Sequence, residues 1–225
     1  MSQERMQPSF PVGLFIDGFT FRKVNEYYRI HHTRHTCIDF TGFRHWVKEE
    51  ALKVFHPRGL IELEAHYYHP FGNPRHSGDP GHAGTLQLER KLNIAGIQMH
   101  YNAGNADSVS KPNSDLMDDA LIFAAYHKIK AVVLVTTQGQ FAALPLDLRR
   151  LGVSTLLLGW NFEYPGPGTD YTIRWHTDSK LKERAAHYIA MDRIMGEEKK
   201  QPPDASVESL FLSSRWKMRR CYYGG

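Results

Sequence analysis

Cysteine and long apolar runs are scarce in this 225-residue chain, and each scarcity excludes a class of protein. The two cysteines, Cys37 and Cys221, are too few for a disulfide framework or a cysteine zinc site. No apolar run approaches the roughly 18 residues of a membrane span, and the opening MSQERMQPSF lacks the apolar centre of a signal peptide. We therefore expect a protein of a reducing, cytoplasmic setting that does not enter a membrane.

The composition that remains is that of an ordinary globular protein, with 41% apolar and 23% charged residues. The formal net charge of +4 permits a polyanionic partner such as RNA but does not require one.

Apolar and amphipathic segments alternate along the first 160 residues. We expect strands at residues 12–17, 60–70, 97–103, 131–135 and 153–160, and helices at 21–32, 42–55, 85–96, 113–128 and 141–152. This alternation predicts a three-layer, Rossmann-like α/β fold in which helices flank a mostly parallel central sheet. A further helix is expected over 179–195. We expect one domain over residues 1–195 and a basic, aromatic tail over 196–225. Thr41 is the expected N-cap of the second helix.

Two acidic stretches suggest a site. Asp17 ends the first strand, and Asp115, Asp118 and Asp119 share one face at the start of the helix over 113–128. Like charges on one face repel unless a cation or water relieves them, and Mg²⁺ would suit these oxygen ligands. The alternative is structural: Asp17 caps a turn with Gly18, and the helix acids complement the helix dipole.

Three segments resemble the NYN domain family of the PIN-like ribonuclease superfamily. LFIDGFTF is similar to the family's IDGxN opening, KPNSDLMDDALIFAAYH to its acidic helix, and VVLVTTQGQFAALPLDLRRLGVSTLLLG to LVSGDSDFxPLVxxLRxxGxxVxxxG. The resemblance runs in the family's order from Val12 to Trp160. The spacing of Phe141, Pro145, Leu148 and Gly152 makes the last segment the most specific.

The resemblance implies a PIN-like fold with an acidic crevice, where one or two Mg²⁺ or Mn²⁺ ions activate water to cleave RNA. By position, Asp17 matches the metal ligand of the first strand, and Asp115 matches the acid that begins the central helix. Asp119, or else Asp118, would supply the next acid.

The departures from the family pattern fall in the same crevice. Gln138 and Gln140 stand where the GDSD motif has two aspartates, and Thr20 stands where the family usually has asparagine. Because an amide is a poorer Mg²⁺ ligand than a carboxylate, one ion is expected rather than two. Gln138 and Gln140 would then orient the attacking water or the scissile phosphate.

Two functions stay open on these residues. One is a metal-dependent endoribonuclease with a reduced acidic site, and the other is a catalytically inactive NYN protein that binds RNA or a protein partner. Lys111, Arg22 and Lys23 are expected to meet RNA phosphates, although Arg22 and Lys23 could equally be the solvated face of a helix. The ending SRWKMRRCYY interleaves cations with rings, which suits single-stranded RNA, a protein partner, a second copy of the chain or docking on the domain itself.

Histidines are numerous, with 13 in the chain, and several could bind zinc or phosphate. No pair among those at 31–35 or among His66, His69, His76 and His82 shows a zinc-site spacing with partners on a defined element. Solvated or nucleic-acid-facing histidines are therefore the favoured interpretation.

Overall fold

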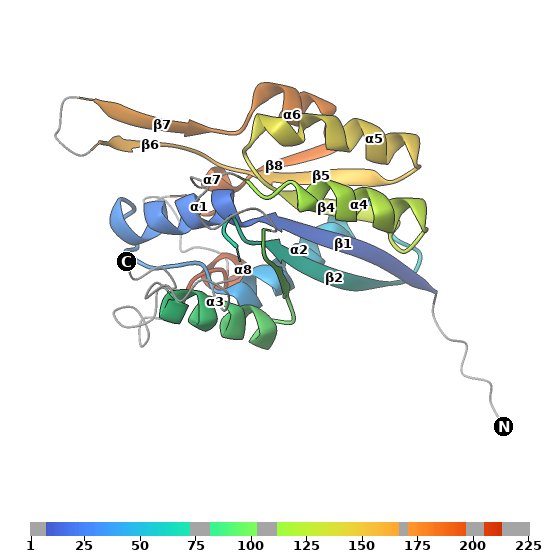
Figure 1. Cartoon of the computed structure of the whole chain (residues 1–225), viewed down its shortest axis with the longest axis horizontal. Helices are drawn as coiled ribbons and strands as arrows, with labels where there is room; N and C mark the ends of the chain where they lie inside the picture. The colour runs from blue at the N-terminus through green and yellow to red at the C-terminus, as the bar shows by residue number, and fades with distance from the viewer. Residues whose placement is uncertain (1–7, 73–81, 103–111, 167–170, 197–204, 213–225) are drawn as a thin grey trace.

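A parallel sheet of six strands forms the centre of the protein, in the spatial order β3-β2-β1-β4-β5-β8 (Figure 1). The computed structural model describes residues 8–72, 82–102, 112–166, 171–196 and 205–212. The strands are β1 (Ser9–Asp17), β2 (Leu60–Tyr68), β3 (Gln98–His100), β4 (Ala131–Val135), β5 (Ser154–Gly159) and β8 (His187–Ala190). The expected α/β class and parallel sheet are confirmed.

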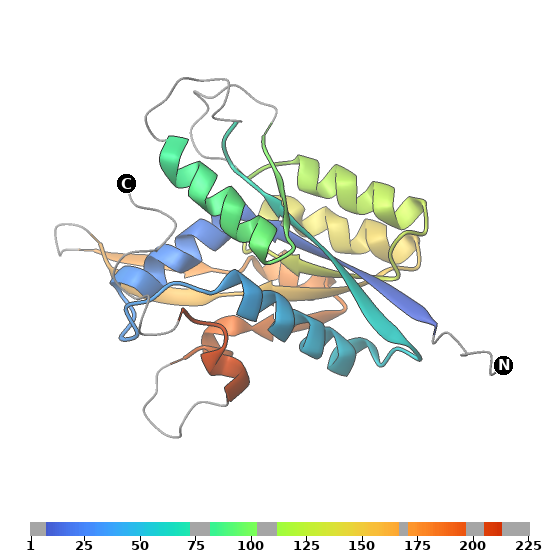
Figure 2. The ribbon, with the colours of Figure 1, turned by 90° about the horizontal axis from the view of Figure 1, so that it is seen from below.

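Helices cover both faces of the sheet, and Figure 2 shows α2 and the α4–α5 pair on opposite sides of the strands. One face packs against α1 (Gly18–Ile30), α2 (Phe40–Phe55), α3 (His82–Ile94) and α7 (Met191–Ile194). The other packs against α4 (Asp115–Ala125), the 3₁₀ turn η2 (Gly139–Ala143), α5 (Leu144–Arg150) and α6 (Ser179–Arg184). The two apolar cores lie on either side of β1, β4 and β5.

The sequence pattern explains which strands are covered on both faces. All five residues of β4 are buried, as expected for an apolar strand between two helical layers. In β2, by contrast, Leu60, Glu62 and Glu64 are exposed, while Ile61 and the other alternate residues face the core. The acidic face of β2 therefore stays open to solvent beside the helices that cover β1 and β4.

The segment after β5 differs from the prediction. Strands β6 (Asn161–Pro165) and β7 (Thr172–His176) form an antiparallel hairpin. The prediction of one long helix over 179–195 is wrong. This segment forms α6, β8 and α7 in turn. The backbone becomes extended at Ala185, and the following strand β8 pairs with β5 at the edge of the sheet. Edge pairing here overrides a helix-like periodicity.

Two smaller expectations also change. Asp39, not Thr41, caps α2: its carboxylate accepts a hydrogen bond of 2.8 Å from the Gly42 amide. Residues 205–212, assigned to the tail from the sequence, begin with α8 (Ala205–Glu208) and bury Leu210 and Phe211 in the core. No helix in the described part of the chain is long and apolar enough to cross a membrane.

Candidate functional site at the carboxyl edge of the sheet

β1 and β4 are parallel neighbours at the centre of the sheet. Strands β2 and β3 are added outward from β1, and β5 and β8 are added in the opposite direction from β4. In parallel α/β sheets, ligands bind in the crevice beyond the strand ends at such a reversal. Asp17 is the last residue of β1, and Thr136 and Thr137 follow β4 directly. The structure therefore places Asp17 and the corner Thr136–Gln140 at the expected edge of the sheet.

Asp17 is fully buried, and both of its carboxylate oxygens accept hydrogen bonds. Oδ1 accepts from the Phe19 amide at 3.1 Å, which makes Asp17 the N-cap of α1. Oδ2 accepts from the hydroxyls of Thr20 at 2.7 Å and Thr136 at 2.9 Å. Burial raises the pKa of Asp17 from 3.8 to about 6, against the opposing effect of these hydrogen bonds.

Threonine hydroxyls form a cover over this carboxyl group. The Thr137 amide donates to the Thr20 hydroxyl at 3.2 Å, and the Gln138 amide donates to the Thr136 hydroxyl at 3.1 Å. The side chain of Gln138 donates in turn to the Thr137 hydroxyl at 3.1 Å. Because all three threonines are buried, the network ties β1, α1 and the β4 corner together.

A carboxylate that the sequence analysis did not single out lies beside the same corner. The Asp178 amide donates to the Thr137 carbonyl at 3.1 Å, and its Oδ1 caps α6 by accepting from Leu181. A β-carbon on Gly139 would lie only 2.8 Å from Asp178 Oδ2, so glycine is what admits this contact. The only sequence signal for Asp178 is its N-cap position before a helix.

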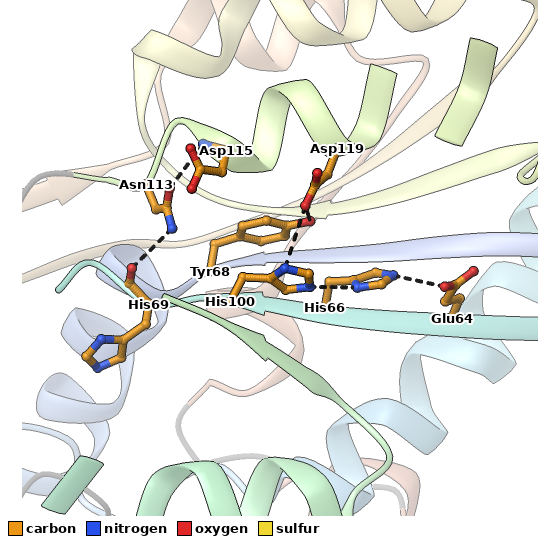
Figure 3. Close-up of polar contacts among 8 residues, drawn as sticks. All are labelled: Glu64, His66, Tyr68, His69, His100, Asn113, Asp115 and Asp119. Carbon is orange, nitrogen blue, oxygen red and sulfur yellow. Dashed lines mark hydrogen bonds and ion pairs between the residues drawn. The ribbon is translucent and has the colours of Figure 1, made fainter. Parts of the chain in front are cut away.

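Asp119 of α4 lies against Tyr68 of β2 and His100 of β3 (Figure 3). Asp119 Oδ2 accepts from the Tyr68 hydroxyl at 2.8 Å and lies 3.7 Å from His100 Nδ1. Asp118 is exposed, so Asp119 is the acid that faces the fold. Asp115, half-buried, begins α4, and its amide donates to Asn113 Oδ1 at 3.0 Å.

Two histidines join Asp119 and Tyr68 in one polar cluster (Figure 3). His100 stacks on the Tyr68 ring at 4.6 Å, and its Nε2 lies 3.0 Å from His66 Nδ1. Burial lowers the pKa of His66 from 6.5 to about 4, and it also lowers the pKa of His100. Burial and the bond to Asp119 raise the pKa of Tyr68. Both imidazoles and the phenol are therefore neutral at pH 7.

The cluster depends on strand register, which single-sequence spacing does not reveal. His66 lies in β2, and the β2–β3 ladder pairs it with Gln98 and pairs Tyr68 with His100. His69, just after β2, is a separate buried group whose Nδ1 accepts from the Phe71 amide at 3.3 Å. His76 lies outside the described residues, as does the side chain of His82.

The expected RNA-binding cations have different surroundings. Arg22 is exposed on α1, and its guanidinium carbon lies 5.5 Å from the centre of the Phe71 ring. Lys23 forms an ion pair of 3.1 Å with Glu26 on the same helix. Lys111 lies outside the described residues.

The donor groups present do not fit the Mg²⁺ or Mn²⁺ ion implied by the NYN resemblance. The oxygens of Asp17 are engaged by three donors, and Asp119 is bonded to Tyr68. The corner offers the amides of Gln138 and Gln140, and Asp178 beside it caps α6. Within residues 8–72, 82–102, 112–166, 171–196 and 205–212, no three His, Cys, Asp or Glu side chains gather to hold a metal ion. Asp17, Asp115 and Asp119 therefore form no such group in the described part of the chain.

Comparison with known proteins informs the fold alone. No protein-family model matches the sequence, and no curated protein matches it. The structure is similar to the crystal structure of a protein of unknown function from Vibrio parahaemolyticus, with a TM-score of 0.50 and 17% sequence identity. The match covers 94% of this chain and all of that protein, so the likeness extends over the whole fold.

Proposed function

We propose that this chain is a PIN-like domain that binds single-stranded RNA at the carboxyl edge of its sheet without cleaving it by metal-dependent hydrolysis. Of the two functions that the NYN resemblance leaves open, the geometry supports binding without cleavage best. The observation that carries the proposal is the enclosure of Asp17 by Thr20, Thr136 and the Phe19 amide.

Metal-dependent hydrolysis needs carboxylates that can bind an ion with their lone pairs. To reach an ion, Asp17 Oδ2 would have to give up two hydroxyl donors in a region with no solvent exposure. Hydrogen bonds to a charged group contribute about 1.5–3 kcal/mol each, so this rearrangement is costly. The threonine cover makes Asp17 a structural anchor.

The exchange of two aspartates for glutamines favours phosphate binding. Carboxylates without a metal ion repel the RNA backbone, whereas the amides of Gln138 and Gln140 can donate to phosphate oxygens and accept from ribose hydroxyls. Gln140 is exposed and Gln138 is half-buried at the corner. At the same edge of the sheet, Arg22 and the Phe71 ring offer a cation and a stacking surface, the pair of features that suits single strands.

The proposal is tested by fluorescence anisotropy with a labelled single-stranded RNA over a range of salt concentrations. We expect the paired substitution Gln138→Ala and Gln140→Ala to weaken binding by about tenfold, since two hydrogen bonds are lost. Arg22→Gln should also weaken binding and lower the salt dependence by about one unit of slope.

The matched control is Arg150→Gln, at the end of α5 that leads back to the amino edge of the sheet. The Arg150 side chain is 78% exposed, and the substitution should leave RNA affinity unchanged. Absence of RNA binding by the wild type would overturn the proposal. Binding that none of the edge variants changes would also overturn it.

A further inference from the structure

The last described segment of the chain is held against the loop between α1 and α2. The Leu212 amide donates to the Cys37 carbonyl at 3.0 Å, and the Thr36 hydroxyl donates to the Leu212 carbonyl at 3.3 Å. Next to these bonds, Ile38 and Phe211 form an antiparallel β-bridge. The backbone of the carboxyl-terminal segment therefore lies directly beside Cys37.

Side chains fasten the same segment to the domain. Leu210 and Phe211 are buried in the apolar core to which Cys37 also belongs. Arg34, whose side chain is 6% exposed, forms an ion pair of 2.9 Å with Glu208. The guanidinium carbon of Arg34 also lies 4.5 Å from the centre of the Phe211 ring. These contacts fix the position of the chain as it passes Cys37.

Cys37 carries the buried sulfur at this junction. It is 1% exposed and packs in the apolar core, and it is disulfide-bonded in the structure. The sequence contains one other cysteine, Cys221, which follows Leu212 by nine positions. Because the burial of Cys37 keeps out the thiol of a second copy, the partner of Cys37 belongs to the same chain.

The stretch from Leu212 to Cys221 is long enough to close such a bond. Nine residues span at most about 30 Å when extended. The α-carbons of a disulfide pair are usually about 4.4–6.8 Å apart. Since the stretch starts at a residue that is hydrogen-bonded to Cys37, it only has to turn back on itself to bring Cys221 within this distance.

We propose that Cys37 and Cys221 form an intrachain disulfide that fastens the carboxyl-terminal segment to the domain. The two residues are far apart in the sequence, so the bond lowers the entropy of the unfolded chain and stabilises the folded state. The bond would also hold both ends of the stretch 213–220, with its four positively charged side chains, at one place on the domain.

Such a bond persists in an oxidising setting, which differs from the reducing setting expected from the scarcity of cysteine. The disulfide does not depend on the proposed RNA binding. Neither cysteine lies among the residues proposed to bind RNA at the carboxyl edge of the sheet.

The oxidant is a small-molecule disulfide such as oxidised glutathione. One protein thiolate attacks it and releases one small thiol, which leaves a mixed disulfide on the protein. The second protein thiolate attacks the protein sulfur of this mixed disulfide and releases the second small thiol. In total, the two cysteines lose two protons and two electrons, and these reduce the oxidant to two thiols.

The test is peptide mapping of the full chain after incubation with oxidised glutathione. Free thiols are blocked with iodoacetamide in denaturant, and the protein is then digested with trypsin without reduction. Cleavage after lysine and arginine leaves Cys37 in the peptide 35–44 and Cys221 in the peptide 221–225. We expect one cross-linked product of these two peptides, which dithiothreitol separates.

Serine variants provide the controls. Cys37→Ser and Cys221→Ser should each abolish the cross-linked product, whereas Tyr222→Ser, at the neighbouring position, should retain it. Urea denaturation gives a second readout. Dithiothreitol should lower the urea midpoint of the wild type and of Tyr222→Ser, and it should leave the midpoint of Cys221→Ser unchanged.

Three results would overturn the proposal. The first is an oxidised wild type in which both cysteines are blocked by iodoacetamide or carry glutathione. The second is a cross-linked dimer on a non-reducing gel without the intrachain product, because the bond would then join two copies. The third is a urea midpoint that dithiothreitol lowers equally in the wild type and in Cys221→Ser, since the reductant would then act elsewhere.

Discussion

Replacing Asp17 by asparagine should stabilise the protein above neutral pH, the opposite of what loss of a buried hydrogen-bonded side chain usually does. The Asn oxygen can accept from the Phe19 amide, as Oδ1 does now. Its amide group can donate to Thr20 and Thr136, because both hydroxyls can rotate from donor to acceptor. The hydrogen-bond pattern survives while the buried charge disappears.

The expected size follows from the pKa of Asp17. The rise from 3.8 in the unfolded chain to about 6 in the folded protein corresponds to about 3 kcal/mol of free energy of unfolding. The folded state holds the Asp17 proton more tightly than the unfolded chain does. The wild type therefore has this contribution of about 3 kcal/mol to its free energy of unfolding below pH 3.8, and it loses the contribution as the pH rises to about 6. The asparagine variant has no such loss.

The assay is urea denaturation of both proteins between pH 4 and pH 8. The difference in free energy of unfolding should grow in favour of Asp17→Asn across this range and level off above pH 6 at up to about 3 kcal/mol. Asp118→Asn, an exposed aspartate of α4, is the control and should show no such pH-dependent gain. A difference that is independent of pH, or a variant less stable than the wild type at pH 8, would refute the reasoning.

Three further variants test separate parts of the structure. Gly18→Ala should cost about 1–3 kcal/mol in urea denaturation, since its β-carbon would lie 2.5 Å from the Tyr68 carbonyl oxygen; an unchanged midpoint would contradict that packing. The pKa of His69 is about 4 in the folded protein and 6.5 unfolded, so stability should fall as the pH drops from 6.5 towards 4. His69→Asn should make that fall shallower, and an identical pH profile would count against the buried neutral imidazole. The paired substitution Gln138→Asp and Gln140→Asp should not produce Mg²⁺-dependent RNA cleavage in a gel assay, because Asp17 stays covered; new cleavage would show that the corner alone decides activity.

Local sequence patterns were sufficient for the central fold. The apolar run of β4 and the alternation in β2 predicted strands where they occur, and Gly96, with a φ of +69°, ends the α3 segment as expected. These features depend on neighbours in the chain. The edge strand β8 depends on pairing with β5, which competes with a helix-like periodicity and which no local pattern reveals.

The site shows the same division between local and non-local information. The sequence placed Asp17 and the β4 corner at one edge of the sheet because parallel strands end together. It could not show that Thr20 and Thr136 would enclose Asp17, since Thr136 lies 119 positions further along the chain. Likewise, the contact between His66 and His100 depends on the register of β2 and β3.

The most direct test of binding without cleavage is one incubation of end-labelled single-stranded RNA with the wild-type protein and Mg²⁺ or Mn²⁺. The products are separated in parallel on native and denaturing gels. The expected result is RNA that is retarded on the native gel and full-length on the denaturing gel. Metal-dependent cleavage by the wild type that disappears in Asp17→Asn would contradict the proposed function and would make Asp17 a catalytic residue.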